Sequence, residues 1–287
     1  MQEQVDILDE RSPQIARPSS DLAVNLANQF AYASGSIIGR NHVLAGKNNQ
    51  DAYQIVANNK FIAAVVCDGC SSGKHSEVGA KLGARLVVEE IGNLLNQEVN
   101  QDSQISIPDF WNLIKFNLLQ KLKNLVTLTN GDMEFVNNYL LFTILGVVIT
   151  EGEMVTFSMG DGAIAINGEL NQIPAYANNA PPYLAYGLYK PDAIDFEIRD
   201  RLPTVELESI LIATDGIDDL LKVEDIHQFW QEDRYFQNPD AIRRKLAMLN
   251  REEVKPDWNK RELNRRSGVL SDDTSLVVVR RLLAVSD

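Results

Sequence analysis

The segment FIAAVVCDGCSSGKHSEVGA, residues 61–80, predicts a buried strand, a short polar loop and the start of a helix, in that order. Its first seven residues, Phe61–Cys67, form an apolar run rich in Val and Ala, which predicts a buried strand. The run ends at Asp68-Gly69, and after a short polar loop an apolar periodicity that starts at Val78 predicts a helix. A strand therefore delivers a carboxylate to its own end, beside a glycine that lets the backbone approach whatever the carboxylate holds.

The preceding segment is predicted to pair with this strand. Gln50-Asp51 opens a short strand, Ala52–Val56, and Asn58-Asn59 provides a hairpin turn. In an antiparallel hairpin the start of one strand lies beside the end of the next. We therefore expect Asp51 and Asp68 at the same edge of a sheet.

The remaining pattern favours an α+β fold, because strands follow one another as hairpins and only a few long helices intervene. Residues 1–28 are predicted to be a loose lead-in and residues 29–287 a single domain. Residues 39–49 are predicted to be a loop, residues 160–162 a tight turn between two strands, and residues 174–192 an irregular surface loop. Further strands are expected at residues 30–38, 140–150, 154–159, 163–167, 194–199, 209–213 and 274–283, and helices at 76–97, 109–125, 217–230 and 239–252.

Composition narrows the class of protein. The 287 residues include 27 Lys and Arg against 40 Asp and Glu, a net charge of −13. This charge argues against binding to nucleic acid or to an anionic membrane surface, and it suits a protein that binds divalent cations.

The longest apolar run, residues 139–150, is too short to span a bilayer. The acidic start has no apolar core typical of a secretory signal, and two cysteines form no disulfide framework, so we expect a cytoplasmic protein.

Acidic residues recur beside small residues at the ends of predicted strands. One Asp-Gly at a strand end is usually only a turn, but several aimed at one sheet edge repel each other and need a cation or shared protons. Oxygen ligands without His or Cys favour Mg²⁺ or Mn²⁺. The sequence therefore predicts a metal site built from Asp51, Asp68, Asp161, Asp215 and Asp272-Asp273.

Five motifs, in order, resemble those of the metal-dependent protein phosphatase family, also called PP2C. They are NNQDA (48–52), VVCDGCSSG (65–73), SMGDGA (158–163), LIATDGIDD (211–219) and SDDTSLVVV (271–279). The resemblance covers about residues 30–283. It implies an αββα sandwich, in which two central antiparallel sheets are flanked by helices, and hydrolysis of phosphoserine and phosphothreonine in protein substrates with two or more Mn²⁺ or Mg²⁺ ions. We expect such a protein to act as a monomer.

The resemblance also implies a role for each matching residue. Asp68 would bridge the two core ions. The carbonyl of Gly69 would help to bind one of them, and Asp215 and Asp272 would complete the other. Asp51 would lie in the outer shell and hold metal-bound water.

The reaction that the resemblance implies is attack on phosphorus by a metal-activated water at a binuclear centre, without a covalent enzyme intermediate. Asp161 resembles the family's acidic residue for a looser third ion, shared with Asp215. The proline- and tyrosine-rich segment 174–192 lies where family members have a variable flap over the active site.

The chain also departs from the family pattern. Gln50 stands where many members have Glu, and Cys70 where the family often has a His that helps to protonate the leaving group. A phosphate-binding Arg found in some members would fall near Gly46 and is missing. Candidate replacement donors are Arg40, Lys47, Lys74 and His75.

Three alternatives remain open from the sequence. A pseudophosphatase of the same fold would act as a regulatory binding protein.

Cys67 and Cys70 form a CxxC, which is also typical of redox pairs and half zinc sites. However, Cys67 ends an apolar strand and suits a core position. The basic residues Arg261, Arg265 and Arg266 form either a solvated face or a surface that receives a phosphorylated protein.

Overall fold

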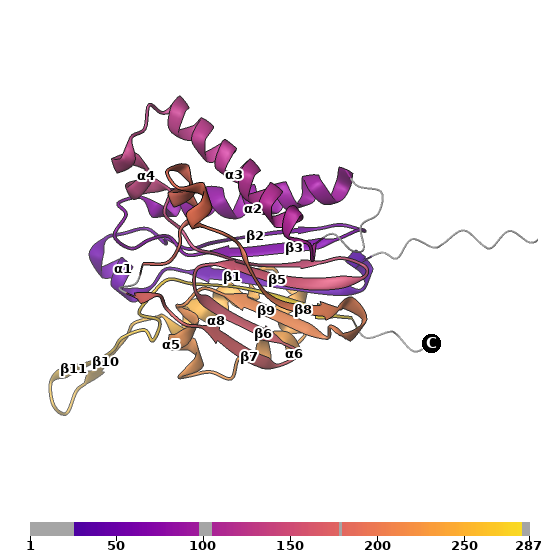
Figure 1. Cartoon of the computed structure of the whole chain (residues 1–287). Helices are drawn as coiled ribbons and strands as arrows, with labels where there is room; N and C mark the ends of the chain where they lie inside the picture. Colours follow the sequence, from indigo (N-terminus) through magenta and orange to yellow (C-terminus); the bar gives the residue numbers. More distant parts are fainter. Residues whose placement is uncertain (1–25, 98–104, 178–179, 283–287) are drawn as a thin grey trace, which may run out of the picture.

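The structure is a computed structural model that describes residues 26–97, 105–177 and 180–282. Two five-stranded antiparallel sheets stack between layers of helices (Figure 1). The strand order is β2-β3-β4-β5-β8 in the first sheet and β1-β12-β9-β6-β7 in the second. This architecture confirms the predicted α+β sandwich.

Most predicted elements are present. The first sheet consists of β2 (Ala52–Ala57), β3 (Ile62–Cys67), β4 (Ile144–Ile149), β5 (Glu153–Met159) and β8 (Glu197–Pro203). The second consists of β1 (Phe30–Ile37), β6 (Gly162–Ile166), β7 (Glu169–Ile173), β9 (Ser209–Ala213) and β12 (Thr274–Arg281). Helices α2 (Ser76–Gln97), α3 (Pro108–Leu128) and α4 (Met133–Tyr139) lie on the side of the first sheet, and α5 (Ile217–Leu221), α6 (Gln228–Gln231), α7 (Arg234–Gln237) and α8 (Ala241–Leu249) on that of the second.

The strand β3 shows why its sequence is a continuous apolar run. Successive side chains of a strand point to opposite faces. Ile62, Ala64 and Val66 pack in the core between the two sheets, whereas the alternate residues Ala63, Val65 and Cys67 pack in the core beneath α2 and α3. Because both faces are buried, neither set of positions tolerates polar residues.

The strand registers bring the acidic sites to one end of the sandwich. Ala52 at the start of β2 pairs with Cys67 at the end of β3, which confirms the predicted hairpin. In the other sheet, Ala213 at the end of β9 pairs with Ala163 near the start of β6 and with Leu276 near the start of β12. The residues that precede or follow these paired ends include every predicted acidic site.

Several local predictions were wrong. The predicted loop 39–49 contains a short helix, α1 (Arg40–Ala45). Residues 160–162 are not a hairpin turn, because β5 and β6 belong to different sheets and this segment crosses between them. Gly162 makes the crossing with a φ of 136°, and a Cβ there would lie 2.5 Å from the carbonyl oxygen of Ala213. The predicted surface loop 174–192 buries part of its chain in the 3₁₀ helix Leu184–Leu188.

One element stands apart from the sandwich. Strands β10 (Glu253–Asp257) and β11 (Glu262–Arg266) form a two-stranded hairpin that extends away from the second sheet (Figure 1). The sequence indicated only a basic, polar stretch there. Strand β7 and helix α4 were also missed.

The described residues start within the predicted lead-in. Residues 1–25 lie outside them, but Leu26–Asn28 form a 3₁₀ turn and Leu26 is buried in the core between the sheets. Within the described part of the chain, no helix has the length and apolar character needed to cross a membrane.

Candidate metal centre

Four predicted carboxylates line one cavity at the end of the sandwich. The cavity has a volume of about 270 Å³. Its wall is formed by His42, Asp68, Cys70, Ser71, Ser72, Asp161, Pro181, Tyr183, Asp215 and Asp272. The acidic members come from the ends of β3 and β9 and from the loops before β6 and β12, so the two sheets build the site together.

Asp68 is fixed by the neighbouring strand. Its backbone N–H donates to Oγ1 of Thr143 at 3.1 Å, and the N–H of Thr143 donates to the Asp68 carbonyl at 2.8 Å. Burial, followed by repulsion from Asp51 and Asp215, raises the pKa of the Asp68 carboxyl well above its usual range. A group in this position favours a cation or a proton beside it.

Asp51 lies behind the cavity rather than in its wall. Its Oδ2 accepts a hydrogen bond from Oγ1 of Thr214 at 2.6 Å, and the residue is 3% exposed. Burial raises its pKa well above the usual range, against the lowering effect of the Thr214 hydrogen bond, and Asp273 adds repulsion. Asp51 therefore lies one layer behind the carboxylates that line the cavity, and the outer-shell role implied for it stays a prediction.

Asp215 and Asp161 complete the acidic wall on the second sheet. Burial, repulsion from Asp272 and repulsion from Asp161 raise the pKa of Asp215 from 3.8 to about 6. Burial also raises the pKa of Asp161, which is 6% exposed. The turn after Asp215 needs Gly216, because a Cβ there would lie 1.9 Å from the carbonyl oxygen of Asp273.

The donor set fits a divalent cation. The cavity is lined by four carboxylates, and among the described residues no Lys or Arg side chain lines it to balance their charge. Carboxylate oxygens are the ligands preferred by Mg²⁺ and Mn²⁺. Burial and mutual repulsion raise the pKa values of Asp68 and Asp215, so the charged forms of these carboxyls are unfavourable in the folded protein. A bound cation would offset this repulsion.

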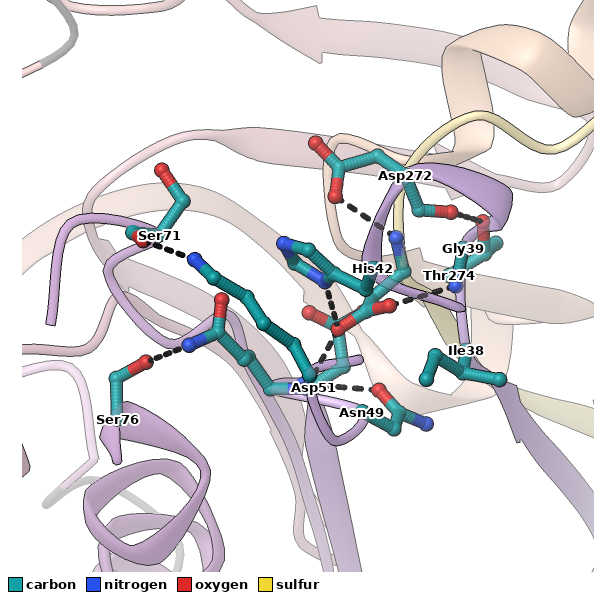
Figure 2. A network of polar contacts seen from close by, with 12 residues as sticks. Ile38, Gly39, His42, Asn49, Asp51, Ser71, Ser76, Asp272 and Thr274 are labelled. Atoms are coloured by element: carbon teal, nitrogen blue, oxygen red, sulfur yellow. Dashed lines mark hydrogen bonds and ion pairs between the residues drawn. The ribbon is translucent and has the colours of Figure 1, made fainter. Parts of the chain in front are cut away.

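Asp273 and His42 were missed as parts of the site. The sequence places Asp272-Asp273 among the acidic sites, but the resemblance implies a role only for Asp272. Asp273 is 2% exposed, and its carboxylate accepts the N–H groups of Gly39 at 2.6 Å and Gln50 at 2.5 Å. His42 lies beside it, with Nδ1 2.8 Å from Oδ2 of Asp273. His42 belongs to α1, in a segment that the sequence predicts to be a loop, and Figure 2 shows its ring. The signal for Asp273 was its place directly before an apolar strand, where a polar residue becomes buried.

Gln50 and Cys70, which depart from the family pattern, each have hydrogen-bond partners in the structure. Gln50 is buried, its Nε2 donates to Oγ of Ser76 at 2.7 Å, and its Oε1 has no hydrogen-bond partner among the described atoms. Burial opposes ionisation of Cys70, but hydrogen bonds with Ser72 and Tyr183 outweigh it and lower its pKa. Cys67 is a buried core residue, and both cysteines are free thiols.

One of the four candidate replacement donors contacts a residue that lines the cavity, although it does not line the cavity itself. The Nζ of Lys47 donates to the carbonyl of Ser71 at 2.6 Å, and Ser71 lines the cavity. The other three have different partners, namely Gly268 for Arg40, Glu134 for Lys74, and Glu77 with Tyr139 for His75.

A larger cavity, of about 930 Å³, lies at the opposite end of β9 and β12. Its arginines are already engaged. Arg280 pairs with Asp233 and lies over the ring of Phe236, and Arg281 lies over the ring of Phe30 and bonds to backbone carbonyls. Size alone therefore does not indicate the site of chemistry.

Comparisons with known proteins identify the family and the fold. The profile of the protein phosphatase 2C family matches residues 38–250. A search of curated proteins finds no match. Among solved structures, a bacterial serine phosphatase is similar, with 14% identity, a TM-score of 0.54, and coverage of 89% of this chain and 99% of that one.

Two further structures have the same fold. The serine/threonine phosphatase of S. agalactiae has 15% identity and a TM-score of 0.55, over 88% of this chain and 99% of that one. The catalytic domain of the serine/threonine protein phosphatase PstP, in complex with two manganese ions, has 12% identity and a TM-score of 0.52, over 89% of this chain and 99% of that one. From its family profile and the fold that it shares with these structures, the chain belongs to the protein phosphatase 2C family.

Proposed function

We propose that the protein is a metal-dependent protein serine/threonine phosphatase that uses two Mn²⁺ or Mg²⁺ ions, with a looser third ion. The observation that supports this most strongly is the convergence of carboxylates from both sheets on one cavity that no Lys or Arg lines among the described residues. We also propose the reducing, cytoplasmic setting that is expected from the sequence.

The proposed ligand set follows the motif matches. Asp68 and the Gly69 carbonyl would hold one ion, Asp68 would bridge to a second held by Asp215 and Asp272, and Asp161 would contribute to the third. Bound ions would neutralise the phosphate and lower the pKa of a water that attacks it.

Residues of the chain itself would orient the substrate and the water. Asp51 lies behind the ligands and is held by Thr214, so its free oxygen can accept a hydrogen bond from an ordered water. The unpartnered Oε1 of Gln50 is a second such acceptor. Lys47 does not line the cavity, but its Nζ donates to the carbonyl of Ser71, which does, and it is the proposed donor for a substrate phosphate.

The segment 174–192 is proposed to influence the choice of protein substrate. Pro181 and Tyr183 from this segment line the cavity, and the Tyr183 hydroxyl bonds to Cys70. Shortening the segment should change preference among phosphoproteins but leave hydrolysis of a small aryl phosphate intact.

A pseudophosphatase is the second candidate. The neutral Gln50, the thiol of Cys70 and the missing arginine favour it. Against it, a module that only binds a partner has no need of several carboxylates with raised pKa values in one cavity.

The test is hydrolysis of p-nitrophenyl phosphate by the wild type and by Asp68→Asn, each with Mn²⁺, Mg²⁺ or EDTA. We expect turnover that needs the metal and disappears in the variant, while circular dichroism shows both proteins folded. A folded wild type without turnover in either metal would favour the pseudophosphatase.

A further inference from the structure

The short helix α1 presents one side chain to the interior, and it is a histidine. His42 is the only buried residue of Arg40–Ala45, at 9% exposed. The helix is fastened to the loop before β12, because the N–H groups of Arg40 and Asn41 donate to the carbonyls of Leu270 and Ser271 at 2.9 and 3.0 Å. The position of His42 is therefore tied to the loop that provides Asp272.

Asp273 orients the imidazole ring of His42. The Nδ1 atom lies 2.8 Å from Oδ2 of Asp273, at an ion-pair distance, although the direction is not that of a regular hydrogen bond and Nδ1 has no other partner among the described atoms. The carboxylate itself cannot turn away, because the N–H groups of Gly39 and Gln50 donate to its two oxygens. A proton on Nδ1 facing this carboxylate leaves the lone pair of the other ring nitrogen, Nε2, free.

The ring lines the same cavity as the proposed metal ligands. His42, Asp272 and Asp273 each offer a ligand atom, and these atoms all lie within 4.8 Å of one another. Figure 2 shows the imidazole between Asp272 and Ser71, which also line the cavity. A buried imidazole at this place, with a carboxylate behind it and acidic groups in front, has the arrangement found when a histidine binds a metal through one nitrogen and is oriented by a carboxylate at the other.

We propose that His42 binds a metal ion through Nε2, beside Asp272, and that Asp273 fixes the ring for this purpose. The inference rests on the metal centre of the proposed function and adds a nitrogen ligand to a set that otherwise contains only oxygen. Imidazole suits transition metals, whereas Mg²⁺ strongly prefers oxygen. The site should therefore prefer Mn²⁺ to Mg²⁺.

The experiment uses the full-length protein and Mn²⁺ as the probe. Electron spin-echo envelope modulation of bound Mn²⁺ detects the ¹⁴N nucleus of a coordinated imidazole. The chain has three histidines. We expect the ¹⁴N modulation in the wild type and in His75→Gln, whose ring is half exposed and packs on Tyr139, and its loss in His42→Gln.

Affinity provides a second readout. His42→Gln should weaken Mn²⁺ binding, measured by calorimetry, by about 10-fold or more, and should weaken Mg²⁺ binding less. Asp273→Asn should keep the ¹⁴N modulation but weaken Mn²⁺ binding about 10- to 100-fold, as is typical when the partner of a ligating histidine is removed. Thermal melts of the apo variants establish that they are folded.

The outcomes separate this inference from the proposed function. If the wild type binds Mn²⁺ without ¹⁴N modulation, or if His42→Gln keeps the modulation, the nitrogen ligand is refuted while the metal centre stands. If the folded wild type does not bind Mn²⁺ at all, the metal centre of the proposed function fails, and this inference fails with it.

Discussion

Neutralising Asp215 should stabilise the metal-free protein, even though it removes a proposed ligand. The near-isosteric change is Asp215→Asn. In EDTA the folded protein keeps this carboxylate beside Asp272 and Asp161, and burial and repulsion raise its pKa from 3.8 to about 6. Asn avoids the charge and keeps the shape.

The size of the effect follows from the pKa. A rise from 3.8 to about 6 corresponds to about 3 kcal/mol. The folded state binds the proton more tightly than the unfolded state, so the free energy of unfolding of the wild type falls as pH rises through this window. The penalty is fully present above the folded pKa. Since the carboxyl lines an open cavity, the figure of about 3 kcal/mol is an upper bound.

The assay is urea unfolding of apo wild type and Asp215→Asn. At about pH 7.5 the variant should be more stable by up to about 3 kcal/mol, and at about pH 5 roughly half of that difference should remain. Adding Mn²⁺ at about 1,000 times its Kd should reverse the order, because the ion then stabilises the wild type by about 4.1 kcal/mol and binds the variant weakly.

The matched control is Asp240→Asn, at the N-cap of α8. Hydrogen bonds from Arg243 and Arg244 lower the pKa of Asp240 to about 2, so neutralising this carboxylate should not stabilise the protein at any pH. If Asp215→Asn is no more stable than the wild type in EDTA at about pH 7.5, with an unchanged urea dependence, the account of a mutually repelling cluster is wrong.

Three further changes test other parts of the structure. Gly216→Ala should lower stability by about 1–3 kcal/mol, measured by urea unfolding, because its Cβ would meet the carbonyl of Asp273 at 1.9 Å; unchanged stability would contradict the close packing of this turn. Lys47→Ala should raise KM for a phosphopeptide with little change in kcat, and an unchanged KM would remove Lys47 as a phosphate donor. Arg265→Glu/Arg266→Glu, on the exposed hairpin, should slow dephosphorylation of a protein substrate but not of p-nitrophenyl phosphate; equal rates on the protein would leave these residues as a solvated face.

The sheets were largely predictable because their strands are local apolar runs. Residues 61–67 and 274–279 are buried, and no helical spacing competes with that pattern. The pairing of Asp51 with Asp68 followed from a two-residue turn and the geometry of a hairpin. The crossing of β5 to β6 between sheets did not follow, since a Gly-Asp-Gly segment fits a hairpin turn equally well.

The parts of the site that were missed depend on long-range contacts. Helix α1 contains only six residues, and its position is fixed by hydrogen bonds to the segment 270–273, more than two hundred residues away. Nothing near His42 in the sequence indicates that its ring is buried. Likewise, the role of Asp273 is apparent only when Gly39 and Gln50 are brought to its carboxylate.

The central claim is tested most directly by release of phosphate from a phosphothreonine peptide. Wild type and Asp68→Asn are compared in Mn²⁺ and in EDTA, with the fold of each checked by circular dichroism. The account predicts release only by the wild type and only with Mn²⁺. Release in EDTA, or equal release by folded Asp68→Asn, would contradict a metal-dependent phosphatase built around Asp68.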